Sequence, residues 1–106
     1  MLHGYKATNE CDENDNPTGG FVDGVGLDIR WQNGPLGRGE DRQEPNGAFV
    51  ETVLDACRQR IDYYQKSKFN CRENDIAITK IEEALMWLNK RTQDREKREV
   101  EGEHKV

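Results

Sequence analysis

Two arginines near the C-terminal end, Arg91 and Arg95, have the residue type and spacing that most clearly suggest chemistry. They are four positions apart and therefore fall on one face of a helix. A guanidinium group presents its donors in a planar fork that matches the oxygens of a phosphate. The pair predicts a site for a phosphorylated anion, extended by Lys97 and Arg98. The alternative is a solvated helix face with local pairs such as Asp94–Arg98 and Arg91 near Asp94.

Asn74 is the natural companion of these arginines, because its amide can read a base edge or a ribose hydroxyl. The alternative is that Asn74 satisfies backbone groups in the first turn of a helix. It lies 17 positions before Arg91, which is about 25 Å at a rise of 1.5 Å per residue. No nucleotide-sized ligand spans that distance. If Asn74 and Arg91 contact one ligand, they must come from two copies whose second helices run antiparallel.

Three aromatic residues, Tyr63, Tyr64 and Phe69, cluster where the tip of a helical hairpin is expected. These rings can pack in the core. Alternatively, one of them can stack on a purine, and such a contact contributes roughly 1–3 kcal/mol to binding. A second set of cationic residues forms a weaker candidate for an anionic ligand: Arg38, Arg42 and Lys66.

The sequence offers little for catalysis. His3 and His104 are the only histidines and lie near the two ends of the chain. Patterns for a nucleophilic serine, a phosphate loop or a zinc protease are lacking. The cysteines Cys11, Cys57 and Cys71 have no metal-ligand spacing, so neither zinc nor any cofactor is expected. We therefore predict a binding protein and not an enzyme.

The first third of the sequence is expected to form β-strands. Val25, Leu27, Ile29 and Trp31 alternate with small or polar residues, which is the pattern of a half-buried strand over residues 25–32. Asn33-Gly34-Pro35 predicts a turn after it. Residues 2–7 and 21–22 are shorter strand candidates, separated by a polar loop over residues 14–20. An antiparallel sheet of two or three strands is expected.

The second half of the sequence predicts two helices. The first runs from about Ala48 to Lys66 with Asn46 as its N-cap, and a short turn at residues 67–69 folds the second back antiparallel. The second helix runs from Asn70 to Arg91, with Asn70 and Glu73 as a capping pair and a frayed, charged tail. The apolar stripes that support these helices are Val50, Val53, Leu54, Cys57, Ile61 and Tyr64 in the first, and Ala77, Ile81, Ala84, Leu85 and Leu88 in the second.

The expected fold is a single α+β domain over residues 1–106: a β-rich part (1–36), a linker (37–47) and a helical hairpin with a charged tail (48–106). Ile78, Met86 and Trp87 lie off the main stripe, so a second partner surface is needed and an oligomer is expected. The net charge of −5 disfavours duplex nucleic acid. The odd cysteine count and the lack of a leader or a long apolar run predict reduced thiols, the cytoplasm and no membrane contact.

Several segments of the sequence resemble the first described family of phage Thoeris anti-defence proteins, whose helical hairpin is similar to that of the anti-CBASS cyclic-nucleotide sponges. These segments are residues 26–35, 44–49, 71–74, 78–92 and 100–104. The resemblance covers most of the chain from Gly26 onward.

The resemblance implies a sponge. Members of the family bind cyclic ADP-ribose isomers made by TIR enzymes and hold them without cleavage. Some also bind cyclic di- or trinucleotides at separate sites, and they assemble into oligomers up to hexamers. The resemblance places the ligand-binding residues on Asn74, Arg91 and Arg95, with Tyr64 or Phe69 stacking the adenine. It places the second site on Arg38 or Arg42 and Lys66, and the protein in the cytoplasm of the infected bacterial host.

Two other functions remain open at this stage. An acidic helical surface can inhibit a host enzyme by pairing helices or mimicking DNA. A nucleic-acid-binding module would use the basic tail, and its affinity would fall steeply as salt rises.

Overall fold

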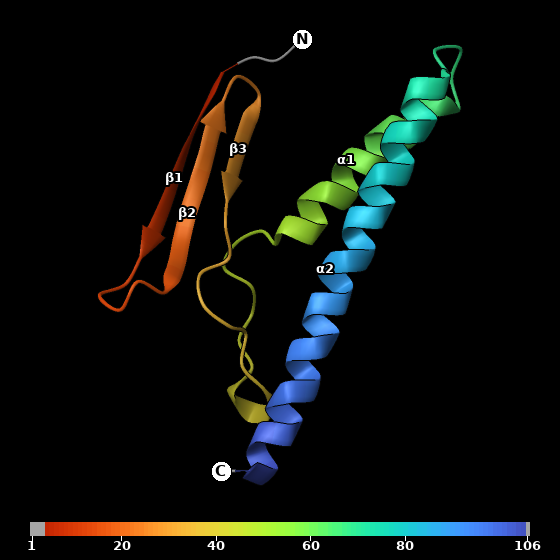
Figure 1. Ribbon diagram of the computed structural model, residues 1–106. Coiled ribbons are helices and arrows are strands. Elements are labelled where there is room, and N and C mark those ends of the chain that lie inside the picture. Colours follow the sequence, from red (N-terminus) through yellow and green to blue (C-terminus); the bar gives the residue numbers. More distant parts are fainter. Residues whose placement is uncertain (1–3, 106) are drawn as a thin grey trace. The chain divides into compact units, whose positions relative to one another are not determined.

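The computed structural model describes the backbone of residues 4–105 and the side chains of residues 4–98 (Figure 1). It contains a three-stranded sheet followed by two helices, which confirms the α+β prediction. The contacts group the chain into two compact units, residues 1–50 and 51–106. No helix in the described range is long and apolar enough to cross a membrane. The elements are β1 (Tyr5–Cys11), β2 (Pro17–Gly24), β3 (Leu27–Arg30), the 3₁₀ turn η1 (Gly39–Asp41), α1 (Val50–Gln65) and α2 (Arg72–Lys105).

The sheet is antiparallel with strand order β1-β2-β3. Tyr5 lies opposite Gly24 at one end of the β1–β2 pair. Side chains on successive strand residues point to opposite faces, and directly opposite residues share a face. The register therefore gathers an apolar face, formed by Tyr5, Ala7, Val22, Leu27 and Ile29.

The strands are displaced from their predicted positions. Val25 and Gly26 form the turn between β2 and β3, so the prediction of one strand over residues 25–32 was wrong at its start. Gly26 has a φ of 69°, and the Val25 side chain is 94% exposed. Residues 17–20 belong to β2 and not to the predicted loop, since Pro17 pairs with Cys11 and Gly20 with Asn9 of β1. The Thr8 carbonyl approaches within 2.5 Å of where a Cβ of residue 20 would lie, so this position of the strand requires glycine. Leu2 and His3 lie outside the described residues.

The reversal between β1 and β2 is organised by one carboxylate. Asp12 Oδ1 accepts hydrogen bonds from the backbone N–H groups of Asn14 at 2.8 Å and Asn16 at 3.0 Å. The Asn16 side-chain amide adds a third bond, to Asp12 Oδ2. These bonds, that of the Asn16 N–H first, hold the pKa of Asp12 below its ordinary value of 3.8, because they favour the charged form.

A second junction joins the end of β3 to the segment before α1. Ala48 N donates to the Arg30 carbonyl at 2.7 Å, and Gln32 N donates to the Ala48 carbonyl at 2.9 Å. Trp31 and Ala48 thus form a parallel bridge. A Cβ on Gly47 would lie 2.5 Å from the Trp31 carbonyl group, so only glycine allows this approach.

Two side-chain amides complete the junction. Gln32 Oε1 accepts from the N–H groups of Asn46 and Gly47. The Asn46 amide pairs with the backbone of Asn33, accepting from its N–H at 2.8 Å and donating to its carbonyl at 2.9 Å. The prediction of Asn46 as the N-cap of the first helix was wrong, because its side chain is used in this pairing and α1 begins at Val50.

The helices differ from their predicted lengths mainly at one end. α1 ends at Gln65, close to the prediction. α2 continues from Arg72 to Lys105, so the predicted end at Arg91 was wrong. The residues beyond Arg91 are mostly Arg, Glu, Lys and Gln, which have high helix propensity and form pairs four residues apart. A charged sequence of this composition extends a helix as readily as it ends one.

The Asp12 turn makes stability depend on pH. The folded pKa of Asp12 is lowered, so its stabilisation is present above about pH 3.8 and is lost as the pH falls through the folded pKa. We expect the amide resonances of Asn14 and Asn16 to shift together on acidification in an NMR titration. Asp12→Asn keeps an acceptor without the charge and should abolish the common shift below pH 3.8. A shared titration that persists in Asp12→Asn would contradict the assignment.

Candidate functional site

The hairpin lacks a closed core of its own. The predicted stripe of α2 is half-buried at every position: Ala77, Ile81, Ala84, Leu85 and Leu88. No hydrophobic side chain among the described residues is fully buried. Met86 and Trp87 are 70% and 71% exposed, as their position off the stripe predicts, whereas Ile78 is half-buried with the stripe. The hairpin therefore has a large apolar surface in contact with solvent.

The hairpin tip is closed by one glutamine. Gln65 Oε1 accepts from the Cys71 N–H at 2.9 Å, and Gln65 Nε2 donates to the Cys71 carbonyl at 2.8 Å. That carbonyl also accepts the first hydrogen bond of α2, from Asp75 N. Cys71 thus precedes the helix where Asn70 was predicted to cap it. The Asn70 amide instead donates to the Ser67 carbonyl, so the prediction of an Asn70 cap was wrong.

The aromatic residues at the tip are exposed and accompanied by cations. The Arg60 guanidinium lies over the Tyr64 ring, 4.9 Å from its centroid, and its Nε donates to the Tyr64 hydroxyl at 3.1 Å. The same guanidinium lies 5.2 Å from the Tyr63 centroid. Phe69 in the turn is 69% exposed, with Lys68 Nζ 5.4 Å from its ring centroid. Two accessible aromatic rings, Tyr64 and Phe69, are therefore available to stack on a planar ligand.

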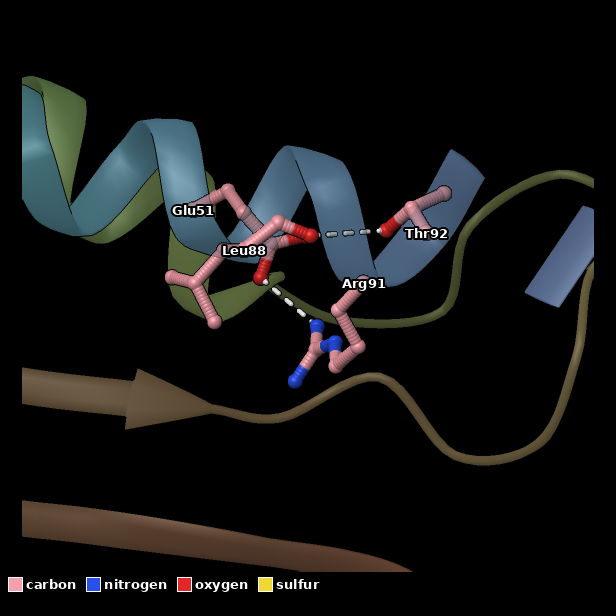
Figure 2. A network of polar contacts seen from close by, with 4 residues as sticks. All are labelled: Glu51, Leu88, Arg91 and Thr92. Atoms are coloured by element: carbon pink, nitrogen blue, oxygen red, sulfur yellow. Dashed lines mark hydrogen bonds and ion pairs between the residues drawn. The ribbon is translucent and has the colours of Figure 1, made fainter. Parts of the chain in front are cut away.

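Arg91 lies at the other end of the hairpin. Its Nη2 donates to Glu51 Oε1 at 3.4 Å, and Figure 2 shows this contact between α2 and the first turn of α1. The hydroxyl of Thr92 points back along α2 and donates to the Leu88 carbonyl (Figure 2). Since α1 starts at Val50, the part of α2 beyond Arg91 extends past the start of α1 along the hairpin. The Arg91 guanidinium is half-exposed and lies beside the α1 N-terminus, which carries a partial positive charge.

The surroundings of Arg91 are cationic. Lys90 pairs with Asp94 at 3.4 Å, and among the described side chains Asp94 forms no ion pair with Arg91 or Arg98, its partners in the alternative interpretation. Arg95 follows Arg91 by one helical turn and makes no hydrogen bond or ion pair with the described residues. An open hollow on α2 borders Arg91, and its lining joins one aromatic ring to charged groups: Trp87, Lys90, Arg91, Asp94, Lys97 and Arg98.

The two halves of the predicted site lie far apart in one chain. Asn74 is half-buried in the first turn of α2. Because α2 is one uninterrupted helix, Asn74 and Arg91 are separated by about 25 Å along its axis, and Asn74 and Arg95 by about 32 Å. The structure thus places Tyr64, Phe69 and Asn74 at the tip, and Arg91 and Arg95 at the opposite end.

The second predicted set is divided between the units. Arg38 and Arg42 flank η1: the Arg38 carbonyl accepts from Asp41 N, and Arg42 N donates to the Gly39 carbonyl. Lys66 follows α1 and pairs with Asp62 at 3.0 Å. These three residues remain candidates by charge alone. Within the described part of the chain, no group of three or more His, Cys, Asp and Glu side chains is placed to hold a metal ion.

Sequence reasoning missed two residues that shape the site. Arg60 was detectable, because it precedes Tyr64 by four positions and such pairs meet on a helix. Glu51 was not, because its contact with Arg91 joins residues 40 positions apart and depends on how the helices pair.

Comparison with known proteins places this chain in a family. The model of the Acb2/Tad1 hairpin domain matches residues 23–93, about two thirds of the chain. The chain is also 50% identical over 76 residues to Thoeris anti-defense 1 of Bacillus phage SBSphiJ7. That match covers 72% of this chain and 51% of the relative, so the chain spans about half the relative's length. The chain belongs to the Acb2/Tad1 hairpin family. The family match includes Asn74 and Arg91 and ends two residues before Arg95.

The geometry of the tip leads to a prediction for Gln65. Gln65→Ala removes two hydrogen bonds that fix the turn and the start of α2. At about 1 kcal/mol for each bond, we expect a loss of roughly 1–3 kcal/mol in the free energy of unfolding, measured by urea denaturation. Gln59→Ala, an exposed change on α1, should stay within about 0.5 kcal/mol of the unmodified protein. Equal stability of the two variants would show that the glutamine does not fix the tip.

Proposed function

We propose that this protein is a phage anti-defence sponge. It binds cyclic nucleotide immune signals, above all the cyclic ADP-ribose isomers of TIR/Thoeris signalling, and sequesters them in the cytoplasm of the infected host without degrading them. Membership of the Acb2/Tad1 hairpin family and the name of the phage relative support this role. The observation that carries the proposal is the placement of paired arginines at one end of α2 and of an amide with aromatic rings at the other.

The binding pocket is formed between two copies. If the second helices of two copies pair antiparallel about a point near residue 83 or 84, Asn74 of each lies beside Arg91 and Arg95 of the other. This arrangement also uses the exposed apolar surface, because Ile76, Met86 and Trp87 lie within eight residues of that point. Exposed apolar surface of this kind drives association. The protein is then a dimer or a larger assembly, up to a hexamer.

The arginine end binds phosphate. A ligand phosphate replaces Glu51 as the partner of Arg91, while Arg95 is already available. Both guanidinium groups form charge-assisted hydrogen bonds to phosphate oxygens, and the partial positive charge of the α1 N-terminus adds to them. The pocket needs only affinity, because sequestration involves no bond cleavage and therefore no activated nucleophile or general acid.

The tip binds the base and the sugar. An adenine ring stacks on Tyr64 or on Phe69, and the Asn74 amide bonds to a base edge or a ribose hydroxyl. Stacking on Tyr64 requires the Arg60 guanidinium to share or leave the ring face. For the second ligand class, cyclic di- and trinucleotides, the cationic residues are Arg38, Arg42 and Lys66. Their positive charge suits a cyclic phosphodiester.

The arginines should dominate affinity. Removing one charged partner of a desolvated anion costs roughly 2–5 kcal/mol. We therefore expect Arg91→Ala and Arg95→Ala each to weaken binding of a cyclic ADP-ribose isomer by tens-fold or more in isothermal titration calorimetry. Arg72→Ala, which removes an exposed cation of α2 that is not among the proposed ligand-binding residues, serves as the control and should bind normally. Unchanged affinity in both arginine variants would exclude the proposed phosphate site.

The ligand should be held intact. After incubation with excess cyclic ADP-ribose isomer, we expect about one molecule bound per pocket. Heat denaturation should release the unaltered cyclic species, identified by chromatography and mass spectrometry. Linear ADP-ribose accumulating beyond the amount of protein would indicate turnover, and the protein would then be a hydrolase.

A further inference from the structure

The strand β1 is an unpaired edge of the sheet. It pairs with β2 on one side, and no other described strand pairs with it. Every residue of β1 is exposed except Thr8, which is half-buried. An edge strand presents a row of free N–H and C=O groups that can pair with another strand. At seven residues, β1 is long enough to extend the sheet.

The charges on this edge are arranged symmetrically. Lys6 and Glu10 lie two positions before and two positions after Thr8. The β1–β2 pair has a bulge between Asn9 and Cys11, but its extra residue lies on β2, so β1 keeps its alternation and all three residues share one face of the strand. Neither charged side chain forms an ion pair with the described residues. On the inner side, Lys6 lies opposite Asp23 of β2, whereas Glu10 lies beside Gly19 and has no basic neighbour across the pair. A carboxylate and an ammonium are therefore available at equal distances from the centre of the edge.

We propose that β1 pairs antiparallel with β1 of a second copy, with Thr8 on the two-fold axis. Lys6 of each copy then lies opposite Glu10 of the other, and Thr8 lies opposite Thr8. Opposite charges in directly facing positions stabilise a strand pair, and like charges destabilise it. All seven residues of β1 take part in this register.

Charge and hydrogen bonding select this register over its neighbours. In a strand, every second residue directs its N–H and C=O groups toward the free edge. A two-fold pair must therefore place even-numbered residues opposite even-numbered ones and odd-numbered residues opposite odd-numbered ones. Shifts by one residue join outward groups to inward ones and are excluded. Larger shifts that keep the parity lose both Lys6–Glu10 pairs. A parallel, in-register pair would place Lys6 against Lys6 and Glu10 against Glu10.

The pairing gives the chain a second way to associate, separate from the α2 contact. It creates a six-stranded sheet in which the apolar faces formed by Tyr5, Ala7, Val22, Leu27 and Ile29 of both copies become continuous. Two different two-fold contacts in one chain allow assemblies larger than a dimer. Pairing of β1 does not depend on ligand binding, so a failure of the proposed sponge function would leave the strand pairing unaffected.

Charge exchange tests the pairing. Lys6→Glu and Glu10→Lys should each lower the mass of the assembly in analytical ultracentrifugation, because like charges then face each other. Mixing the two variants should restore the mass, since each supplies the charge that the other lacks. Glu13→Lys, the same change of charge outside the strand, serves as the control and should leave the mass unchanged. Unaltered mass in both single variants, or no recovery on mixing, would overturn the proposal.

Cross-linking tests the register directly and does not depend on the charges. In a background with Cys11→Ser, Cys57→Ser and Cys71→Ser, Thr8→Cys places two thiols opposite each other within disulfide range. Tyr5→Cys in the same background is the control, because its symmetry mate lies about 20 Å away, six residues along the strand. We expect oxidation to link the Thr8→Cys chains into covalent dimers and the Tyr5→Cys chains much less. Equal yields from both variants, or no linkage of Thr8→Cys, would overturn the register.

Discussion

The rise of an uninterrupted α-helix is the constraint on which the proposed site depends. α2 runs for 34 residues, about 51 Å, without a break. It keeps Asn74 and Arg91 about 25 Å apart, and no side-chain movement closes that distance. In the proposed function, each chain therefore contributes two half-sites, one with the arginines that would bind phosphate and one with an amide and aromatic rings. A pocket that uses both halves requires a second copy of the chain.

Side-chain hydrogen bonds fix several of the chain reversals in this fold. No hydrophobic side chain in the described part of the chain is fully buried, so packing within one copy is limited. Instead, single polar side chains fix the chain reversals: Asp12 between β1 and β2, Gln65 at the hairpin tip, and Gln32 with Asn46 before α1. These bonds set the local geometry of the chain. The apolar surface that one copy leaves exposed can be buried only by association with another copy or a partner.

Periodicity predicted the helices well and the strands less well. The three- and four-residue spacing of Ala77, Ile81, Ala84 and Leu88 forms one stripe on a helix, so the hairpin could be predicted. The alternation from Val25 to Trp31 was misleading, because two residues of a turn, Val25 and Gly26, continue a two-residue pattern by chance. Likewise, Asn46 is a good N-cap by residue type, but its partner Asn33 is recognisable only once the chain has folded.

For the candidate site, too, some features could be predicted from the sequence and others could not. Spacing alone predicted that Arg91 and Arg95 share a face and that Asn74 is too far away to join them. The ion pair between Arg91 and Glu51 could not be predicted, because it depends on the register of α1 against α2. The far end of α2 was missed because a run of charged residues is compatible both with a helix and with a solvated tail.

Complementation between defective copies tests the proposed two-copy pocket most directly. An Asn74→Ala chain and an Arg91→Ala/Arg95→Ala chain should each bind a cyclic ADP-ribose isomer poorly when alone. Co-assembled, and with mixed oligomers verified by native mass spectrometry, they should regain high-affinity binding at a fraction of the pockets, because some interfaces then join an intact amide to intact arginines. Failure of verified mixed oligomers to regain any binding would contradict a pocket built from two copies.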